Sequence, residues 1–273
     1  MTVRIACVQP EVFQENNKCY LLIEDIIKDI FSNHDSCDII CLPERWVPLT
    51  REKKVNVQKE RGKNYQFVKQ LANDYSVSII SGAIWEKRES SSKPRITSYF
   101  FDNFGEEVGR QDKIHLYSYE RKNFEPGEDL QIFSFKNMCF AILICFDMAF
   151  FETPRLAAES GADILFSPTQ IRSDGIENWE AYLKARALEN RIPVVACNTF
   201  GKILKRNFPG RSKIISFVED FISPSKLRIV EGPIDSSGFI CDEIDLIFPK
   251  KLRKLRFKEI IEKSAINVRK VDF

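Results

Sequence analysis

The sequence predicts an α/β fold in which helices cover the faces of β-sheets. Short apolar runs rich in β-branched residues alternate with segments of helical periodicity in both halves of the chain. Strands that are apolar almost throughout are typical of sheets covered on both faces. No low-complexity linker interrupts the 273 residues, and 44% of them are hydrophobic. One large domain over residues 1–273 is therefore expected, with a C-terminal helix and tail at 246–273, although two small domains would also suit this length.

The first half of the chain predicts alternating strands and helices followed by a hairpin. Each expected strand is a short apolar run, and the apolar residues of each expected helix recur at helical spacing. Asn103-Phe104-Gly105 is a turn sequence typical of a hairpin. The expected strands are 3–8, 39–42, 77–85, 96–101 and 107–111. The expected helices are 19–31 and 65–75.

The second half repeats the alternation after a polar, aromatic stretch with Pro and Gly at 113–129, which is expected to be a functional loop. The longest apolar run lies between Met138 and Phe146 and predicts a buried strand. The strands expected here are 138–145, 164–167, 194–197, 213–217, 227–231 and 239–245. The expected helices are 154–160 and 177–191.

Charge and hydropathy exclude several classes of partner. A formal net charge of +2 gives no reason to expect nucleic acid or an acidic partner. The basic stretch 250–258 has no aromatic platform beside it, so it is expected to be an exposed helix face or a tail that packs on a partner subunit. The N-terminus lacks the apolar stretch of a signal peptide, and the run from Met138 to Phe146 is too short to span a bilayer. No nucleic-acid or membrane partner is expected.

The cysteines indicate a reducing compartment. Eight cysteines without a secretory signal are typical of free thiols in a cytoplasmic protein. Cys37 and Cys41 are spaced like a metal-binding pair, but no second pair completes a site, and His34 and His115 are the only histidines of the chain. Neither a metal nor another cofactor is expected.

Cys145 is the most informative residue because the expected strand at 138–145 ends on it. A helix-compatible segment follows within a few residues, and a thiol near a helix start experiences a partial positive charge that favours the thiolate. A free cysteine is often simply a small buried hydrophobe. Cys145 therefore becomes a candidate nucleophile only if other residues support that role.

Two further strand ends supply that support. Glu44 follows the apolar strand at 39–42 directly after Pro43, and Lys113 follows the charged strand at 107–111 just before the functional loop. A thiol-dependent acyl transfer needs a nucleophile, a base for its proton and a cation for the developing oxyanion. Cys145, Glu44 and Lys113 are those three residue types.

At these residues the chain resembles the nitrilase, or carbon–nitrogen hydrolase, superfamily in its amidase-like branch. The Glu-Lys-Cys triad of that family is matched by Leu42-Pro43-Glu44, by Lys113 in Asp-Lys-Ile-His-Leu and by Cys145 in Ile-Cys-Phe-Asp, in the same order. Further matches run over most of the chain, from Gln9-Pro10 to Phe208-Pro209-Gly210-Arg211-Ser212. The resemblance implies a four-layer αββα sandwich of two face-to-face sheets, which periodicity alone does not give.

The resemblance also implies catalytic roles. Cys145 attacks a carbonyl or nitrile carbon and forms a thioester-type intermediate, and the backbone N–H of Phe146 donates to the oxyanion. Glu44 takes the thiol proton, passes it to the leaving amine and then activates water. Lys113 stabilises the oxyanion and the ionised forms of Glu44 and Cys145.

Other residues near the triad have less specific patterns. Glu120 matches the second glutamate of the family and is expected to orient Lys113 or the substrate, although Glu125 competes for that place. His115 is expected to have a structural role rather than to act as the base. Arg172, in the loop after the strand at 164–167, is a candidate substrate clamp for a carboxylate. Arg186 and Glu189, one helical turn apart, are expected to form an intrahelical pair.

The residues after the nucleophile bear on the substrate. Cys145-Phe146-Asp147 is similar to the amidase and carbamoyl-hydrolysing branches, whereas nitrile-cleaving members typically have Cys-Trp-Glu. A small linear amide or carbamoyl compound is therefore the expected substrate, cleaved to an acid and ammonia. Nitrile hydrolysis, acyl transfer to an amine, and a catalytically inactive binding or assembly protein remain as alternatives.

Self-association is also expected, as a homodimer or a larger assembly. The family resemblance carries this expectation, together with apolar residues that are expected to be exposed after Cys145 and in the basic tail. These are Leu156, Tyr182, Leu252, Leu255 and Phe257.

Overall fold

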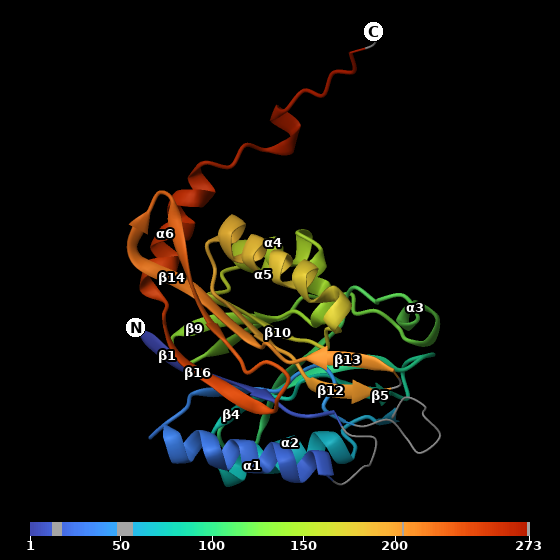
Figure 1. The fold of residues 1–273 in the computed structure, drawn as a ribbon. Helices are drawn as coiled ribbons and strands as arrows, with labels where there is room; N and C mark the ends of the chain where they lie inside the picture. Colours follow the sequence, from blue (N-terminus) through green and yellow to red (C-terminus); the bar gives the residue numbers. More distant parts are fainter. Residues whose placement is uncertain (13–17, 48–56, 204, 272–273) are drawn as a thin grey trace.

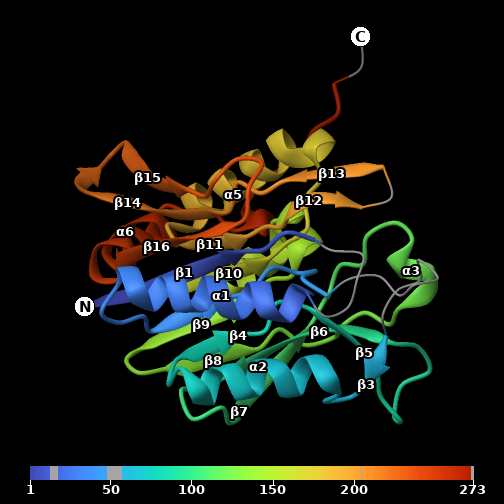
Figure 2. The ribbon, with the colours of Figure 1, turned by 60° about the horizontal axis from the view of Figure 1, so that its bottom comes forward.

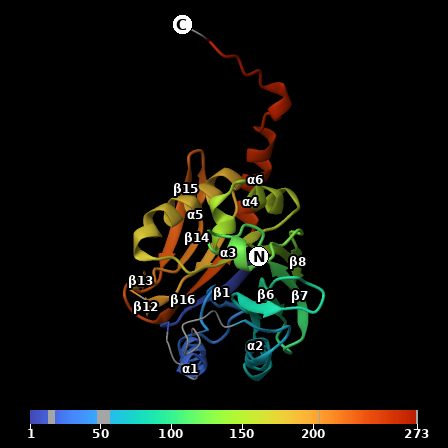
Figure 3. The same ribbon diagram turned by 90° about the vertical axis from the view of Figure 1, so that its right-hand side faces the viewer.

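The computed structural model describes residues 1–12, 18–47, 57–203 and 205–271 (Figure 1). Within these residues, two large sheets lie face to face and helices cover their outer sides (Figures 1 and 3). The predicted four-layer αββα sandwich is thus confirmed.

The first sheet combines the N-terminal part of the chain with one strand from near the C-terminus. Its strand order is β16-β1-β2-β4-β6-β5-β3, with β7 paired to β6. Because β1, β2 and β4 are parallel neighbours, their carboxyl ends meet at one edge of the sheet. The strands of this sheet are β1 (Thr2–Gln9), β2 (Ile39–Cys41), β3 (Gln58–Lys59), β4 (Ser78–Ile80), β5 (Ile84–Lys87), β6 (Arg95–Phe101), β7 (Glu107–Asp112) and β16 (Gly238–Asp245).

The second sheet has the order β15-β14-β11-β10-β9-β8, and its three central strands are parallel. A separate hairpin, β12 (Phe200–Ile203) and β13 (Arg206–Pro209), lies beside it and was not anticipated from the sequence. The strands of the second sheet are β8 (Ile132–Phe135), β9 (Met138–Ile142), β10 (Ile164–Pro168), β11 (Val194–Cys197), β14 (Lys213–Ile222) and β15 (Ser225–Glu231).

Side-chain alternation explains why both faces of each sheet are covered. Along β1, Ile5 and Cys7 pack between the two sheets, whereas Ala6 and Val8 pack under α1 and α2 (Figure 2). On the second sheet, Leu165 and its neighbours pack under α4 and α5. The helices are α1 (Lys18–Asn33), α2 (Lys63–Asp74), α3 (Glu120–Asn123), α4 (Glu152–Glu159), α5 (Ile176–Asn190) and α6 (Ile247–Lys258).

The strand predicted at 77–85 is interrupted, and the interruption matters for the site. Gly82 has a positive φ of 71°, and a Cβ there would lie 2.1 Å from the Pro43 carbonyl oxygen. The neighbouring Ser81 carbonyl accepts a hydrogen bond from the indole N–H of Trp46 at 2.8 Å. The break between β4 and β5 therefore lets the segment that carries Glu44 pack directly on the sheet.

The C-terminal part differs from the expectation at Leu252, which is buried, and at Phe257, which is half-buried with the Arg155 guanidinium 4.5 Å from its ring centroid. Leu252 of α6 is buried against Phe217 and Phe248, whereas Leu156, Tyr182 and Leu255 are exposed as predicted. The apolar side of α6 thus packs on the chain's own β14 rather than facing outward. Beyond α6 the chain extends away from the sandwich (Figure 1). Among the described residues, no helix is both long and apolar enough to cross a bilayer.

Candidate active site

Glu44 lies just beyond the carboxyl end of β2, between the two sheets. Its backbone N–H donates to the Thr169 carbonyl at 3.1 Å, which ties it to the segment after β10. The side chain is 5% exposed. The strand ends of the two sheets therefore meet at this carboxylate.

Lys113 follows β7 and reaches into the same space. Its ammonium Nζ lies 2.7 Å from Glu44 Oε1 and 2.9 Å from Glu120 Oε2, and the residue is 1% exposed. Burial opposes the charge, but Glu44, Cys145 and Glu120 outweigh it and raise the pKa of Lys113 well above its usual value. Lys113 is therefore a fixed cation at neutral pH.

Glu120 begins α3 and is held on both oxygens. One oxygen accepts the Tyr117 backbone N–H at 2.7 Å, and the carboxylate is paired with Lys113. Burial raises the pKa of Glu120; the charge of Lys113 opposes the shift, and Glu44 adds to it. The competing Glu125 instead contacts Ser92 at 2.9 Å. Of the two glutamates, the structure brings Glu120 to Lys113.

Cys145 lies where the chain turns after β9. The strand predicted to end on it stops at Ile142, and Cys145 opens a short 3-10 helix, η1 (Cys145–Ala149). Its φ of 48° is uncommon for a residue with a side chain and marks a strained turn. The Glu44 carboxylate and the backbone N–H of Gln170 lie close enough to the thiol to shift its pKa.

The electrostatics of the thiol correct one expectation. Burial, followed by the charge of Glu44, raises the pKa of Cys145 well above its usual value, although Lys113 and the Gln170 N–H act in the opposite direction. The favourable charge expected at the helix start is outweighed by burial of the thiol and by the charge of Glu44. The raised pKa thus favours the neutral thiol of Cys145 over a preformed thiolate.

Asp147 fixes the turn that contains Cys145 through hydrogen bonds, a role that the sequence analysis did not predict. Its buried carboxylate accepts the backbone N–H groups of His115 at 2.7 Å and Ile144 at 2.9 Å. Oδ1, which accepts the His115 N–H, also lies 3.0 Å from His115 Nδ1. The imidazole of His115 stacks on Phe150 with ring centroids 4.1 Å apart. Asp147 thus joins the loop of Lys113 to the turn of Cys145, and His115 has the structural position that was predicted.

Arg186 supports the same turn from α5. It pairs with Glu189 at 2.7 Å, as the helical spacing predicted. Its guanidinium also donates to the carbonyls of Met148 at 3.1 Å and Ala149 at 3.2 Å. The end of η1 is therefore fixed to the helix that packs behind it.

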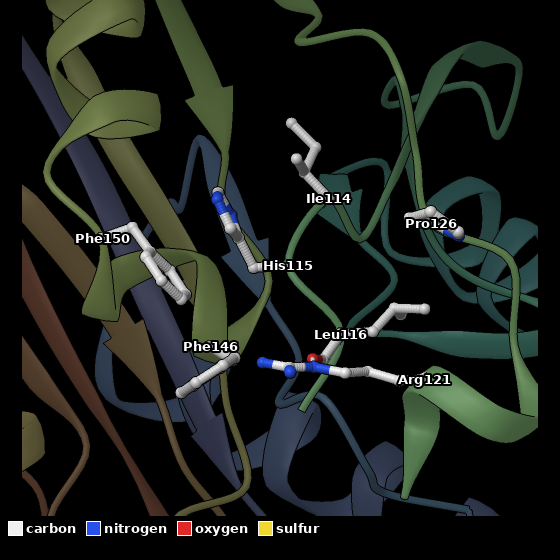
Figure 4. A pocket seen from close by; sticks show the side chains of 7 residues that line it. All are labelled: Ile114, His115, Leu116, Arg121, Pro126, Phe146 and Phe150. Atoms are coloured by element: carbon white, nitrogen blue, oxygen red, sulfur yellow. Dashed lines mark hydrogen bonds between the residues drawn. The ribbon is translucent and has the colours of Figure 1, made fainter. Parts of the chain in front are cut away.

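A cavity of about 320 Å³ adjoins the catalytic cluster (Figure 4). Phe146, next to the nucleophile, contributes its ring, which packs edge-on against Tyr117 and Phe150. The guanidinium of Arg121 points toward Phe146, and its Nε donates to the Leu116 carbonyl at 3.0 Å (Figure 4). The lining residues are Ile114, His115, Leu116, Arg121, Pro126, Phe146 and Phe150.

Arg172 lies apart from this cavity lining. Its guanidinium contacts Asp174 at 3.1 Å, and its side chain is 39% exposed. The Arg172 guanidinium is therefore already paired with a carboxylate of its own chain, and it is less suited to bind a substrate carboxylate.

Together, the fold and the site indicate a thiol-dependent hydrolase. The model of the carbon-nitrogen hydrolase family matches residues 4–223, and the chain belongs to that family.

Relatives and solved structures agree with this assignment. A probable nitrilase of Schizosaccharomyces pombe is 32% identical over 263 residues, which span 93% of this chain and 93% of the relative. A 2-oxoglutaramate amidase of Bacillus subtilis is 29% identical over 215 residues, with 77% and 78% covered. The crystal structure of Saccharomyces cerevisiae Nit3, a member of branch 10 of the nitrilase superfamily, superposes with a TM-score of 0.81 at 21% identity, with 97% of each chain covered.

Proposed function

We propose that this chain hydrolyses the C–N bond of a small linear amide through a thioester on Cys145. One observation carries the proposal: the buried Lys113 ammonium lies 2.7 Å from the Glu44 carboxylate, and Cys145 lies close enough to both that their charges shift the pKa of its thiol. Nucleophile, base and cation thus meet in one cluster, in which Glu44 and Lys113 are buried and Cys145 is partly exposed, as acyl transfer to a substrate requires.

In the acylation half-reaction, Glu44 accepts the thiol proton as the sulfur attacks the carbonyl carbon. The electron pair of the C=O bond moves onto oxygen, where Lys113 and the backbone N–H of Phe146 stabilise the charge. The tetrahedral species collapses, the C–N bond breaks, and Glu44 returns its proton to the leaving nitrogen, which departs as ammonia.

In the deacylation half-reaction, Glu44 takes a proton from water as the oxygen attacks the thioester carbon. The C–S bond breaks, the acid leaves, and the sulfur regains a proton from Glu44. Glu120 does not transfer protons in this scheme; it keeps Lys113 in place at 2.9 Å.

The substrate class is proposed from the residues after the nucleophile and from the relatives. The Bacillus subtilis relative is a 2-oxoglutaramate amidase, which favours an amide, and a carbamoyl compound would react by the same steps. The Schizosaccharomyces pombe relative is a probable nitrilase, so nitrile hydrolysis is the second candidate. Acyl transfer would differ only in that an amine replaces water.

Ammonia release from matched amide, carbamoyl and nitrile compounds tests the proposal. The wild-type chain should release ammonia from an amide, and Cys145→Ala should abolish turnover while substrate binding persists, because the nucleophile alone is removed. Mass spectrometry of stalled enzyme should show the acyl group on the peptide that contains Cys145. Turnover that survives in Cys145→Ala would refute the assignment, and ammonia from the nitrile alone would favour the second candidate.

We also propose that the chain self-associates and acts in the cytoplasm. The exposed apolar residues Leu156, Tyr182 and Leu255 support self-association, and free cysteines throughout the described residues support a reducing compartment. Light scattering at micromolar concentration tests the first point, because a monomer there would contradict it.

A further inference from the structure

The loop 113–127 carries two charges of the candidate active site and most of the cavity wall. Lys113 begins the loop and Glu120 lies in its middle, and their charged groups are 2.9 Å apart. Five of the seven residues that line the cavity of Figure 4 also belong to this loop. The contacts that hold its two ends together therefore determine where both charges lie.

The two ends of the loop are in direct contact. The Lys113 carbonyl accepts the Gly127 N–H at 2.8 Å. A Cβ on Gly127 would lie 2.6 Å from the Asp112 carbonyl oxygen, so a larger residue would have to push the two ends apart. β6 adds a backbone hydrogen bond from outside the loop, because the Ile96 carbonyl accepts the Lys113 N–H at 2.8 Å. The base of the loop is therefore narrow and closely packed.

Arg95, the first residue of β6, contacts both ends of the loop with one side chain. Its Nη1 lies 3.3 Å from Asp112 Oδ2 and donates to the Pro126 carbonyl at 3.0 Å. Its Nη2 lies 3.6 Å from Glu125 Oε2. The Arg95 side chain is 21% exposed, and contacts of partly buried charges are screened less than those at the surface. Asp112 is fixed from its other side by the Arg88 guanidinium at 2.7 and 2.5 Å, so Arg95 joins a rigid carboxylate to the last residues of the loop.

We propose that Arg95 is a positioning residue that closes the loop 113–127 and thereby holds Glu120 against Lys113. This inference rests on the proposed amide hydrolysis and deepens it, since it names a residue outside the cluster on which stabilisation of the oxyanion depends. A displacement of about 1 Å at a catalytic group can lower the rate by about a hundredfold. Closure of the loop is therefore required for the reaction as well as for the fold.

Arg95 acts through geometry rather than through its charge. The pKa of Lys113 is raised by Glu44, Cys145 and Glu120 against the effect of burial, and the pKa of Glu120 is raised first by burial. Among the described residues, Arg95 is not a main cause of either shift. Its removal should therefore displace the Glu120 carboxylate without directly changing the charge of the Lys113 ammonium.

The protein should stay folded without Arg95, because a second contact ties the same two segments further from the loop. The Nε2 of Gln111 donates to the Asp129 carbonyl at 2.8 Å, and its Oε1 accepts the Gln131 N–H at 2.7 Å. Arg88 also keeps Asp112 in place. Arg95→Met thus tests the position of the loop rather than the fold of the domain.

Two variants change Arg95 itself: Arg95→Met removes the contacts with both ends, and Arg95→Lys keeps the charge but loses the guanidinium fork. Gly127→Ala disturbs the base of the loop by a second route. Arg228→Met is the matched control, because Arg228 likewise contacts a carboxylate, that of Asp242 at 3.0 Å, and a backbone carbonyl, that of Glu243 at 3.2 Å. Thermal melting verifies that each variant is folded.

With the small linear amide that the wild type cleaves fastest, Arg95→Met should lower kcat by about ten- to a hundredfold and leave KM within about twofold. Gly127→Ala should have the same signature, Arg95→Lys should recover part of the loss, and Arg228→Met should change neither constant. In a Glu120→Gln background, Arg95→Met should cost little more, because the contact that it supports is already weakened. Without any substrate, hydrogen exchange in peptides from 113–127 should be faster in Arg95→Met than in Arg228→Met.

Three kinetic results would overturn the inference. An unchanged kcat in Arg95→Met would show that the other contacts close the loop sufficiently. A loss confined to KM would mean that the loop binds the substrate instead of placing Glu120 and Lys113. A double variant whose loss equals the product of the two single losses would mean that Arg95 acts independently of Glu120. If the wild type cleaves no amide, the proposed function fails by itself, and unchanged hydrogen exchange in Arg95→Met would then overturn the role of Arg95 as well.

Discussion

Replacing Lys113 by methionine is expected to destabilise the protein in a pH-dependent way. The side chain is 1% exposed and holds two carboxylates, so its removal leaves Glu44 and Glu120 buried without a counter-ion. Losing one partner of a buried pair typically costs about 3–5 kcal/mol of unfolding free energy. Catalysis should also fall by roughly a hundredfold or more, as for other oxyanion donors.

The pH dependence follows from the distance between the two carboxylates. Both oxygens lie within 3 Å of the same nitrogen, so they are at most about 6 Å apart. At an effective dielectric constant of about 20, two like charges at that distance repel by roughly 3 kcal/mol, or about two pKa units. The pKa of Glu120, already raised by burial, should therefore rise further in Lys113→Met.

A carboxyl group whose folded pKa exceeds its unfolded pKa contributes stability that is fully present below the unfolded value and lost as pH rises through the folded value. Lys113→Met should therefore be destabilised by roughly 3 kcal/mol more at pH 8 than at pH 5. Urea denaturation of wild type and variant at both pH values measures this difference. Lys69→Met is the control, since Lys69 makes an exposed pair with Glu106 at 3.4 Å and its loss should cost less than about 1 kcal/mol. An equal destabilisation of Lys113→Met at pH 5 and pH 8 would refute the reasoning.

Three other substitutions separate the roles of the neighbouring residues. Glu44→Gln should abolish ammonia release while Cys145 can still be alkylated by iodoacetamide, faster toward alkaline pH, because the carboxylate that takes its proton is gone whereas the burial that raises its pKa remains; ammonia release at the wild-type rate would exclude Glu44 as the base. Asp147→Asn should cost about 1–3 kcal/mol of unfolding free energy and lower kcat, because the amide has only one oxygen to accept the two N–H groups that the carboxylate oxygens accept separately. An unchanged melting temperature and kcat would show that these hydrogen bonds of Asp147 are dispensable. His115→Ala should keep measurable turnover, since its imidazole contacts Asp147 and Phe150; complete loss of activity, with normal melting, would point to a Cys–His mechanism.

The sequence was sufficient to predict which residues converge, because strand ends are local features. Glu44 and Cys145 each follow an apolar run, and parallel strands bring their carboxyl ends to one edge of each sheet. The face-to-face arrangement of the two sheets then places these edges together. That last step came from the family resemblance, because alternation within a strand does not reveal which sheet packs on which.

Features that depend on packing between distant segments escaped prediction. Gly82 breaks an apolar run that is continuous in sequence, because Pro43 must approach its Cα closely. Asp147 was interpreted only as a clue to the substrate, since its contact with His115 joins residues that lie 32 positions apart.

The raised pKa of Cys145 is compatible with catalysis because the proton has only a short distance to travel. Transfer from the thiol to Glu44 moves one negative charge from carboxylate to sulfur and leaves the total charge of the cluster unchanged. Lys113 contacts the Glu44 carboxylate at 2.7 Å, and its charge acts to lower the pKa of Cys145, so it stabilises the negative charge before and after the transfer. Transfer therefore exchanges one buried carboxylate for one buried thiolate beside the same cation, without bringing a new ion into the low-dielectric site. The protonated thiol protects the resting enzyme from stray alkylation and oxidation, because the thiolate is the reactive form. When the sulfur attacks the substrate carbonyl, the electron pair of the C=O bond moves to oxygen and the thiol proton moves to Glu44.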